Sequence, residues 1–599
     1  MATLGRPQGF NVGPVSFRTD AADIRYVTWA QTELVRRIFI TARDRDWQEV
    51  PPSSWSWSAS HEAESLSLRF AARHTGNGID FCWRGWFSID VPARSLSFSF
   101  TGTALSDMEI CRLGLVVLHP LEALVGGTVE TSGPSGKGLH DINEQIHPQP
   151  ILGGYPGAIT APFKTLNIQS RVGDTFQFDF TGDLFELEDQ RNWCDASFKS
   201  YCTPLSFGSP RLVDAGDRIA HRVDVLASLT PNRSTEPAHG DSVSFQPVAA
   251  GRRLPDLGVC IDPSAVASTH WERSSAFTHI RIDLASTASS EDLTRAERLL
   301  LTGERLELGL AVTAEEIPAE LLTAIGVTSA PIRILLLQKG QALIDPVLGK
   351  RATDELRSHG CDAAIFTAID DHFVELNRSI PRPITGTGIA LLASPSVHSS
   401  DVLTAAENVP ALRCVIQTAR ILHPGLEVVV SPLAPSIASV PTDEAWQNAA
   451  LAWFVASYDT LTTSDVTSVT VARELLPRRR GQDPLAAAWS EVLEALARAR
   501  DGILLTASVT AGSPLHVLGW QNSAGAVEFL AVNLADKARK LRVVEPPSGL
   551  LSTGHVIWGV IGDGEEPALR SALTVPGYGV LQGSFSPTNT ATRVHDPAI

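Results

Sequence analysis

The sequence predicts an α/β plus β protein, in which a central (β/α)8 barrel of the TIM type is flanked by an N-terminal β-sandwich and a small C-terminal β-sandwich. Three observations carry this prediction. Strand-like alternation dominates the first part of the chain, short apolar runs alternate with helical stretches in the middle, and alternation returns near the end. With 599 residues the chain is also too long for one hydrophobic core. We therefore expect three domains, at 1–250, 251–503 and 504–599.

The first domain, 1–250, is expected to be an antiparallel sandwich. Its clearest strands alternate apolar and polar residues and are bounded by Gly, Pro, Ser or Asp: 65–74, 78–90, 95–105 and 175–185. Many short strands separated by turn signals favour two packed antiparallel sheets. The polar stretch 231–242 is expected to be a connection to the next domain.

The middle domain, 251–503, has the pattern of a barrel. Eight short apolar runs are each followed by a helical stretch: 257–262, 279–284, 306–312, 333–338, 362–368, 388–394, 426–432 and 468–473. This number of β-then-α units fits a closed barrel. A doubly wound open sheet is the alternative. No GxGxxG or GxxxxGK[ST] follows any run, which weakens the nucleotide-binding form of that alternative.

The last domain, 504–599, returns to β character. Two alternating segments joined by a polar turn occupy 526–544, and a final strand is expected within 573–585. These segments predict a small second sandwich.

The composition is that of an ordinary soluble globular protein, with 43% hydrophobic and 19% charged residues. A net charge of −17 argues against binding to nucleic acid or to an anionic membrane. The start of the sequence, MATLGRPQGF, has no apolar signal region, and no apolar run is long enough to span a bilayer. The seven cysteines are scattered and form no CxxC, so we expect reduced thiols and a cytoplasmic protein.

The barrel rule selects the first candidate site, because the active site of such a barrel lies at the C-terminal ends of its strands. Asp262 ends the first predicted strand, and the segment ELNR after the fifth holds Glu375, Asn377 and Arg378. If this segment is extended, Glu375 and Asn377 point the same way. A carboxylate beside an amide can orient a water or a sugar hydroxyl. The alternative is a loop ion pair with an Asx turn.

Two further residues occupy this face of the predicted barrel. His398 follows the sixth strand among small polar residues and can serve as an acid/base, an oxyanion donor or a metal ligand. Asp283, near the end of the second strand, is a candidate for hydroxyl binding, although its more common role is as the partner of Arg281.

A dense polar stretch, ELEDQRNWCDASFKSYC at 186–202, is the second candidate. Its charged and amide residues are Glu186, Glu188, Asp189, Arg191, Asn192, Asp195 and Lys199. The aromatic residues threaded among them argue against full exposure and predict a half-buried loop. Polar groups in such a loop must satisfy one another in a network or bind a ligand.

No cofactor is expected from the sequence. It contains no HxH, HExxH or GxSxG, so neither a zinc-hydrolase motif nor a serine-nucleophile elbow is present. A divalent metal in place of cationic donors is left open, as is assembly into a homo-oligomer.

The stretch FELEDQRNWCDASFKSYCTPL (185–205) resembles a signature of the D-apionate lactonases, also called D-apionolactonases, of which the chain would be a divergent member. Further blocks are similar to that family: 114–122, 145–150, 373–381 and 395–402. The resemblance implies hydrolysis of a five-membered sugar lactone to the aldonate. It also implies a layout of sandwich, barrel and sandwich.

The leading hypothesis is therefore a hydrolase that acts on a sugar-derived γ-lactone by carboxylate-assisted attack of water. Glu375 is the first choice for the general base. Donors to the oxyanion would come from Asn377, Arg378 or His398, and Asp283 with residues of 186–199 would bind hydroxyls.

The alternative is a glycoside hydrolase that uses two carboxylates at the barrel mouth, with Glu375 paired with Glu474 or Glu188. A non-catalytic carbohydrate-binding protein is the third hypothesis. In each case the partner is a small carbohydrate or sugar lactone.

Overall fold

The structure is a computed structural model that describes residues 8–30, 32–62, 64–230, 241–247, 253–261, 274–328, 331–380, 382–395, 397–399, 401–435, 444–477, 483–510, 513–543, 551–560 and 573–585. The chain divides into two compact units. Unit 1 comprises Met1–Asn192 and Ala196–Glu236. Unit 2 comprises Pro237–Ile599 together with the tripeptide Trp193–Asp195.

Unit 1 is a β-sandwich, as the alternation predicts. One sheet contains β1 (Gln8–Val12), β2 (Val15–Asp20), β3 (Asp23–Trp29), β4 (Thr32–Asp44), β9 (Met108–Pro120), β16 (Glu186–Asp189), β17 (Ser197–Tyr201) and β18 (Arg211–Val213). The other contains β5 (Pro52–His61), β6 (Ser65–Gly76), β7 (Ile79–Asp90), β8 (Ser95–Ala104), β10 (Gly127–Gly133), β11 (Gly136–Ile142), β14 (Thr165–Gln169), β15 (Thr175–Thr181) and β19 (Arg218–Ser228). Short elements connect them: α1 (Leu121–Leu124), β12 (Ile151–Leu152), β13 (Tyr155–Pro156), η1 (Gln190–Trp193) and η2 (Leu205–Phe207).

The sandwich core follows directly from the period of two. On β6, for example, Leu66, Leu68 and Phe70 are buried, while the residues between them reach toward solvent. The predicted strands at 65–74, 78–90, 95–105 and 175–185 correspond to β6, β7, β8 and β15.

The stretch 186–202 differs from the predicted loop. Its residues form β16, the short 3-10 turn η1 and β17, and both strands are buried along their whole length. The half-buried loop was therefore wrong, because strand pairing of Glu188 with Lys199 places opposite charges side by side and lets polar residues enter a sheet.

The central part of unit 2 is a closed parallel barrel, with β28 pairing back onto β21. Its strands are β21 (Asp256–Cys260), β22 (Phe277–Leu284), β23 (Arg305–Ala311), β24 (Pro331–Leu337), β25 (Ala364–Ile369), β26 (Gly388–Ala393), β27 (Glu427–Leu433) and β28 (Ser468–Val471). They coincide with the eight predicted runs, so the barrel is confirmed over the open sheet. The strands read as nearly continuous apolar runs because the barrel buries both of their faces.

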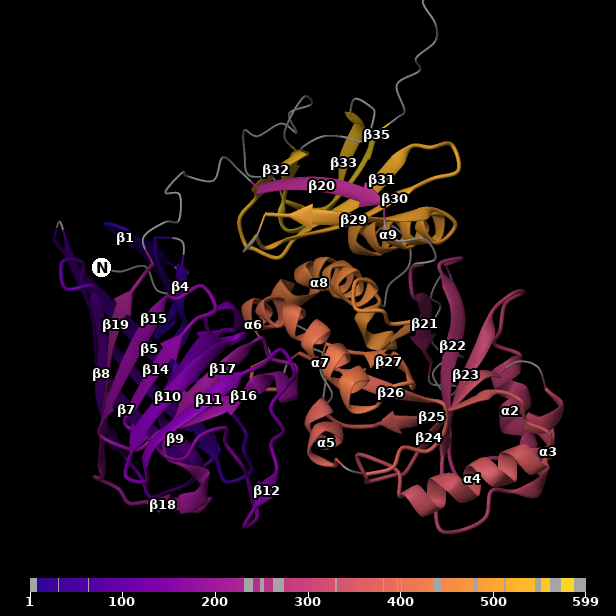
Figure 1. Ribbon diagram of the computed structural model, residues 1–599, viewed down its shortest axis with the longest axis horizontal. Coiled ribbons are helices and arrows are strands. Elements are labelled where there is room, and N and C mark those ends of the chain that lie inside the picture. The colour runs from indigo at the N-terminus through magenta and orange to yellow at the C-terminus, as the bar shows by residue number, and fades with distance from the viewer. Residues whose placement is uncertain are drawn as a thin grey trace, which may run out of the picture. The chain divides into compact units, whose positions relative to one another are not determined.

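Helices follow the barrel strands (Figure 1). They are α2 (Ser290–Glu297), α3 (Ala319–Val327), α4 (Pro346–Ser358), α5 (Phe373–Arg378), α6 (Val402–Glu407), α7 (Val409–Leu422), α8 (Glu444–Thr462) and α9 (Pro484–Arg500), with the 3-10 turn η3 (Arg473–Leu475) after β28. Among the helices that the structure describes, none has both the length and the apolar character that a membrane crossing requires.

The C-terminal part of unit 2 is a β domain. It contains β29 (Ile503–Val509), β30 (Leu515–Gln521), β31 (Val527–Asn533), β32 (Arg539–Val543), β33 (Leu551–Val560), β34 (Leu573–Val575) and β35 (Gly577–Phe585). The strand β20 (Asp241–Pro247) joins the same sheet, between β29 and β32. Figure 1 shows β20 in magenta among these orange and yellow strands. The sheet therefore takes one strand from before the barrel. Of the predicted connection 231–242, the part 231–240 lies outside the described residues.

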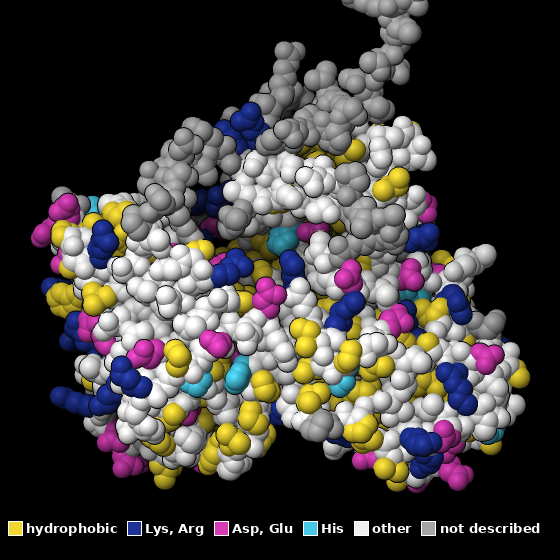
Figure 2. Space-filling model, in the orientation of Figure 1, with side chains coloured by type: hydrophobic (Ala, Val, Ile, Leu, Met, Phe, Trp, Pro, Cys, Tyr) yellow, Lys and Arg dark blue, Asp and Glu magenta, His cyan; other side chains and the backbone are white. Residues whose placement is uncertain are grey.

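The charged residues are mixed on the surface. On the face drawn in Figure 2, acidic and basic side chains are interspersed rather than gathered by sign. The net charge of −17 does not concentrate into one acidic patch on that face.

Candidate functional site

The tripeptide Trp193–Asp195 contacts the loops that follow β25 and β26, all within unit 2. The Nδ1 atom of His398 is hydrogen bonded to a carboxylate oxygen of Asp195. Because a carboxylate only accepts, the proton lies on Nδ1 and the lone pair of the ring on Nε2. The Asn408 amide donates to the other oxygen of Asp195, at 2.6 Å from Oδ1. Asp195 and His398 thus form a dyad of the kind that orients a general base.

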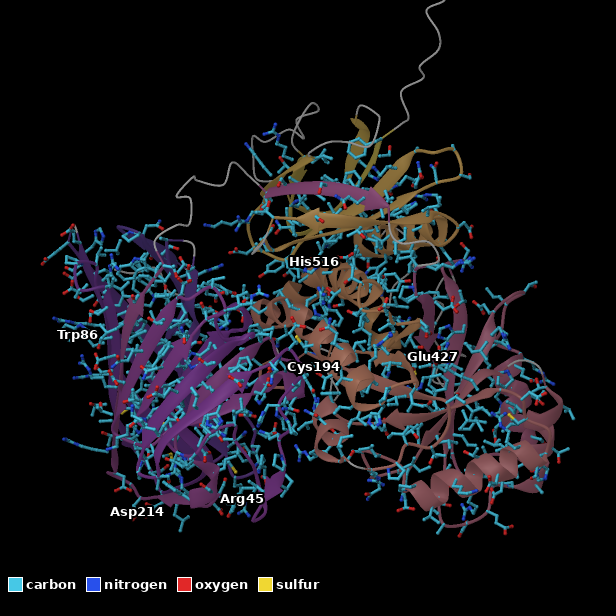
Figure 3. The ribbon with its side chains drawn as sticks, in the orientation of Figure 1. Arg45, Trp86, Cys194, Asp214, Glu427 and His516 are labelled. Carbon is cyan, nitrogen blue, oxygen red and sulfur yellow. The ribbon has the colours of Figure 1, made fainter. Side chains whose placement is uncertain are left out.

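Asp195 is 3% exposed, whereas the His398 side chain is 24% exposed. The carboxylate is therefore enclosed by protein while part of the imidazole reaches solvent. Asn408, at 3% exposure, is also held by its hydrogen bond to the carbonyl of Pro395, at 2.8 Å. Asn408 therefore holds the Asp195 carboxylate in place, and the carboxylate in turn orients the His398 imidazole. Cys194, labelled in Figure 3, is the central residue of the tripeptide and is fully buried.

Hydrogen-bond donors surround the Trp193 ring. Its centroid lies 5.4 Å from that of His372 and 5.9 Å from that of His398, and the guanidinium carbon of Arg378 lies 5.9 Å from it. Within the described residues, Trp193 Nε1, His372 Nδ1 and both Nε and Nη2 of Arg378 are buried without a hydrogen-bond partner. Such groups are costly unless something pairs with them. We call Trp193, Asp195, His372, Arg378, His398 and Asn408 the tryptophan cluster.

The local sequence explains how these residues are placed. The helix α5 begins directly after His372. Burial lowers the pKa of the His372 imidazole, and the negative charge of Asp371 opposes this shift. His372 is therefore neutral near pH 7. Glu375 pairs with Arg378 one turn later, at 3.5 Å, which holds the guanidinium near Trp193.

The expected extended conformation of ELNR was wrong. Residues 373–378 form α5, so side chains two positions apart point to different sides. Phe373, Val374, Leu376 and Asn377 are buried, and Glu375 is only partly so. The apolar residues at helical spacing favour the helix over an extended loop. Glu375 and Asn377 therefore do not form the adjacent pair that the extended reading required.

A second group of charges lies at the barrel mouth. Arg281 binds both oxygens of Asp283, at 2.9 and 3.1 Å, and its Nη1 donates to the Ser431 carbonyl at 2.7 Å. Burial raises the pKa of Asp370; Arg281 opposes this, and the negative charges of Asp283 and Asp371 add to it. Residue 309 must be a glycine for Asp283 to fit, because a Cβ atom at this position would lie 1.8 Å from Oδ1 of Asp283. Asp262 lies outside the described residues.

A buried polar network lies inside the barrel beneath these charges. Glu307 is fully buried and accepts hydrogen bonds from the hydroxyls of Ser431 and Thr470, the second at 2.9 Å. Arg333 lies 3.5 Å from its other oxygen. Burial also lowers the pKa of His279, which bonds Thr470 at 2.9 Å. The network links the barrel interior to Arg281 through Ser431.

The remaining predicted residues of 186–199 lie in unit 1 and bond to one another. Arg191 binds both oxygens of Asp189, at 2.8 and 2.7 Å, and donates to the carbonyls of Asn143 and Glu144. Asn192 donates to the carbonyl of His147 at 2.7 Å. These three side chains therefore tie a loop to the sheet.

Glu186, Glu188 and Lys199 form a second buried group in unit 1. Lys199 Nζ lies 2.6 Å from Glu188, and the Tyr201 hydroxyl donates to Glu186 at 2.9 Å. Burial would raise the pKa of Glu188, but the charges of Lys199 and Arg112 outweigh it and hold the pKa below its usual value. Burial lowers the pKa of Lys199 to about 8.

Metal-ligating atoms gather at one place within the described residues. Asp183, Cys202 and His221 offer one atom each, all within 4.8 Å of one another. The groups already have protein partners: Cys202 bonds the Leu115 carbonyl at 3.4 Å, and the Leu115 N–H donates to His221 Nδ1 at 3.3 Å. Burial raises the Cys202 thiol pKa far above its usual range, which disfavours the thiolate that a metal requires.

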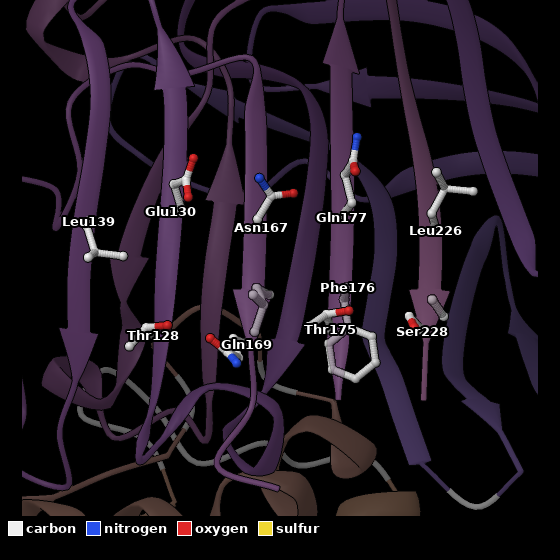
Figure 4. A pocket seen from close by; sticks show the side chains of 12 residues that line it. Thr128, Glu130, Leu139, Asn167, Gln169, Thr175, Phe176, Gln177, Leu226 and Ser228 are labelled. Atoms are coloured by element: carbon white, nitrogen blue, oxygen red, sulfur yellow. The ribbon is translucent and has the colours of Figure 1, made fainter. Parts of the chain in front are cut away.

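A shallow hollow of about 410 Å³ lies on the outer face of the second sheet of unit 1. Figure 4 shows its side chains in two rows that cross β11, β10, β14, β15 and β19. Six of its twelve lining residues carry an amide or a hydroxyl, five are apolar, and Glu130 is its carboxylate. None of the predicted site residues lines this hollow, which lacks a base of the kind present in the tryptophan cluster.

Sequence reasoning selected His398, Arg378 and Asp195 but missed their arrangement. His372 and Asn408 were not selected at all. His372 lies three positions before the segment ELNR. Asn408 gave no signal, because it follows a short helix far from 186–199 in sequence.

Comparison with known proteins covers the N-terminal part and, with one relative, 70% of the chain. Residues 2–230 match the family described as D-apionate lactonase, N-terminal domain. A curated D-apionate lactonase from Brucella anthropi is 22% identical over 463 residues, which cover 70% of this chain and 71% of that protein.

Solved structures are only distantly similar. A GH51 arabinofuranosidase from Xanthomonas axonopodis pv. citri has a TM-score of 0.36 and 11% identity, covering 58% of this chain and 100% of that one. A GH36 α-galactosidase from Geobacillus stearothermophilus has a TM-score of 0.26 and 8% identity, covering 97% of this chain and 100% of that one. These low scores support no functional argument. Residues 2–230 are therefore similar to the N-terminal domain of the D-apionate lactonases, and the bacterial relative extends the similarity to 70% of the chain.

Proposed function

We propose that the protein is a hydrolase that opens a sugar-derived γ-lactone to its aldonate, with the tryptophan cluster as its active site. One observation carries this proposal. The Asp195–His398 dyad lies beside buried donors on Trp193, His372 and Arg378 that have no partner in the described structure. The similarity to D-apionate lactonases supports the choice of a lactone as substrate.

In the proposed reaction, His398 Nε2 removes a proton from water as the water oxygen bonds to the lactone carbonyl carbon. Asp195 keeps the imidazole in the required tautomer and stabilises the imidazolium that forms. Arg378 and the Trp193 N–H donate to the carbonyl oxygen as it becomes negative.

The tetrahedral intermediate then collapses. The bond from the carbonyl carbon to the ring oxygen breaks, and the imidazolium of His398 returns its proton to the leaving alkoxide. The products are a carboxylate and a free hydroxyl, with one proton released. Glu375 acts in this scheme by holding Arg378 rather than as the general base.

The test is acid release from a panel of sugar γ-lactones. We expect His398→Gln to lower kcat by about 10²–10⁴-fold, the usual contribution of a general base. His359→Gln is the matched control, because His359 is exposed at the end of α4 and is not a member of the cluster. Full turnover by His398→Gln would show the proposed mechanism to be wrong.

A second candidate function has its own observation. Asp370 has a raised pKa and lies near Asp283, whose charge is held by Arg281. A carboxyl group with a raised pKa beside a carboxylate is the kind of pair that glycoside hydrolysis uses. Turnover of aryl glycosides that is lost in Asp370→Asn but kept in His398→Gln would favour this function over lactone hydrolysis.

A further inference from the structure

Unit 1 contains a buried arginine that makes no direct ion pair within the described residues. Arg112, on β9, is 5% exposed, and within the described residues it has neither an ion pair nor a hydrogen-bond acceptor. Its Nη1 atom is buried without a partner. The guanidinium lies over the Tyr201 ring, with its carbon 3.7 Å from the centroid, and 5.7 Å from the centroid of Trp47. Aromatic faces recover only part of the cost of desolvating a cation.

Gln149, which is hydrogen bonded to Glu188, has an unused acceptor. Gln149 donates its amide N–H to Glu188 at 3.0 Å, while its own Oε1 is buried without a partner. Glu188 is bound on its other oxygen by Lys199. Arg112 influences Glu186, Glu188 and Lys199 electrostatically, so these side chains form one group.

The mixture of donors and acceptors limits the ligand. A monoanionic carboxylate would pair with Arg112, and neighbouring hydroxyls would donate to Gln149 Oε1 and to the glutamates. A dianion would be repelled by Glu186 and Glu188. Trp47, which is 40% exposed, offers an aromatic face at the edge of the group, and such faces suit the apolar side of a sugar chain.

We infer that Arg112 and Gln149 form a binding site in unit 1 for a polyhydroxylated monocarboxylate, that is, for a sugar acid. The ligand class is also the product class of the proposed hydrolysis. The inference nevertheless rests on unit 1 alone, and it stands whether or not the tryptophan cluster is catalytic.

Direct binding to the full chain tests this site. The probes are D-ribonate, ribitol, which lacks the carboxylate, and acetate, which lacks the hydroxyls, each measured by titration calorimetry. We expect D-ribonate to bind at least tenfold more tightly than either control probe. Equal binding of ribitol would overturn the role of the carboxylate.

Variants locate the binding. Arg112→Met should weaken D-ribonate binding at least tenfold, and Arg73→Met is the matched control, since Arg73 is an exposed cation of the same unit paired with Asp80. His398→Gln should bind D-ribonate as the wild type does. Loss of binding in His398→Gln would move the ligand to the tryptophan cluster and overturn the inference without affecting the proposed function.

Stability separates a ligand site from a structural residue. Arg112 makes no direct ion pair, although its charge acts on Glu186 and Glu188, so the unfolding midpoint of Arg112→Met should fall only slightly. A large fall, or failure to fold, would make Arg112 structural and overturn the inference. Gln149→Met provides an independent variant and should weaken D-ribonate binding several-fold.

Discussion

Two neighbouring parts of one polar stretch differ in how their side chains are satisfied. Asp189 and Arg191 are bonded to each other and to loop carbonyls, so nothing remains for a ligand. A few residues later, Asp195 joins His398 beside donors that lack partners in the described structure. Both parts hold buried aspartates, so burial and charge alone do not distinguish them. Residual hydrogen-bonding capacity is what separates a structural network from a candidate site.

The largest expected effect concerns stability, in the part where Asp189 and Arg191 are bonded to each other. Arg191→Ala leaves the buried Asp189 carboxylate uncompensated and should lower the free energy of unfolding by about 3–5 kcal/mol. Urea unfolding measures it. Arg73→Ala, which breaks an exposed pair of the same geometry, should give no clear change. If Arg191→Ala were as stable as the wild type, the contrast between the two parts would fail.

The dyad should behave in the opposite way. Asp195→Asn keeps the shape of the side chain but no longer favours the proton on His398 Nδ1, so we expect kcat to fall by about 10²–10³-fold. Steady-state turnover of a sugar lactone measures this loss. The unfolding midpoint should change little in comparison with Arg191→Ala, and a collapse in stability with unchanged kcat would instead make Asp195 a structural residue.

His119, a buried histidine of the sandwich, tests how burial changes the pH dependence of stability. Burial lowers the pKa of His119 to about 3. Below about pH 6.5, the ordinary histidine pKa, the imidazole of His119 takes up a proton in the unfolded chain but not in the folded one. This difference lowers the free energy of unfolding by about 1.4 kcal/mol per pH unit, until the pH reaches the pKa of the folded state. His119→Gln should flatten that part of the stability profile between pH 6 and pH 4. An unchanged slope would assign the acid sensitivity to other groups.

The smallest effect concerns a single donor. Trp193→Phe removes the indole N–H and keeps an aromatic ring against His372 and His398. We expect about a tenfold lower kcat, from loss of one hydrogen bond to the oxyanion. Stability should hold, because the lost N–H had no partner in the described structure. A lower stability with unchanged kcat would contradict the assignment of this group to the site.

Much of the fold could be predicted from periodicity. The eight barrel runs became β21–β28 because parallel strands buried on both faces give short apolar runs that helices separate. Local periodicity could not place β20, because its partner β29 follows it in the sequence only after the entire barrel. It also missed α5, whose six residues are too few to show a helical period against an extended alternative.

The site was less predictable. The barrel rule selected His398 because only strand order was needed. Its partner Asp195 lies 203 positions earlier, and no spacing rule relates them. Arg112 gave no signal either, since one arginine in the apolar strand MEICRLGLVVLHP looks like an ordinary outward-facing residue. Its lack of a partner can be seen only when the neighbours are known.

The distance between Asp195 and His398 along the chain has a consequence for how the protein is made and how it can change. The carboxylate is synthesised long before the imidazole that it orients, so a nascent or truncated chain with one and not the other has no dyad. A fragment that begins after Asp195 would keep His398 but lack its acid partner. Exchange of the three residues 193–195 between relatives would therefore alter the proposed chemistry, although they lie far from the barrel in sequence.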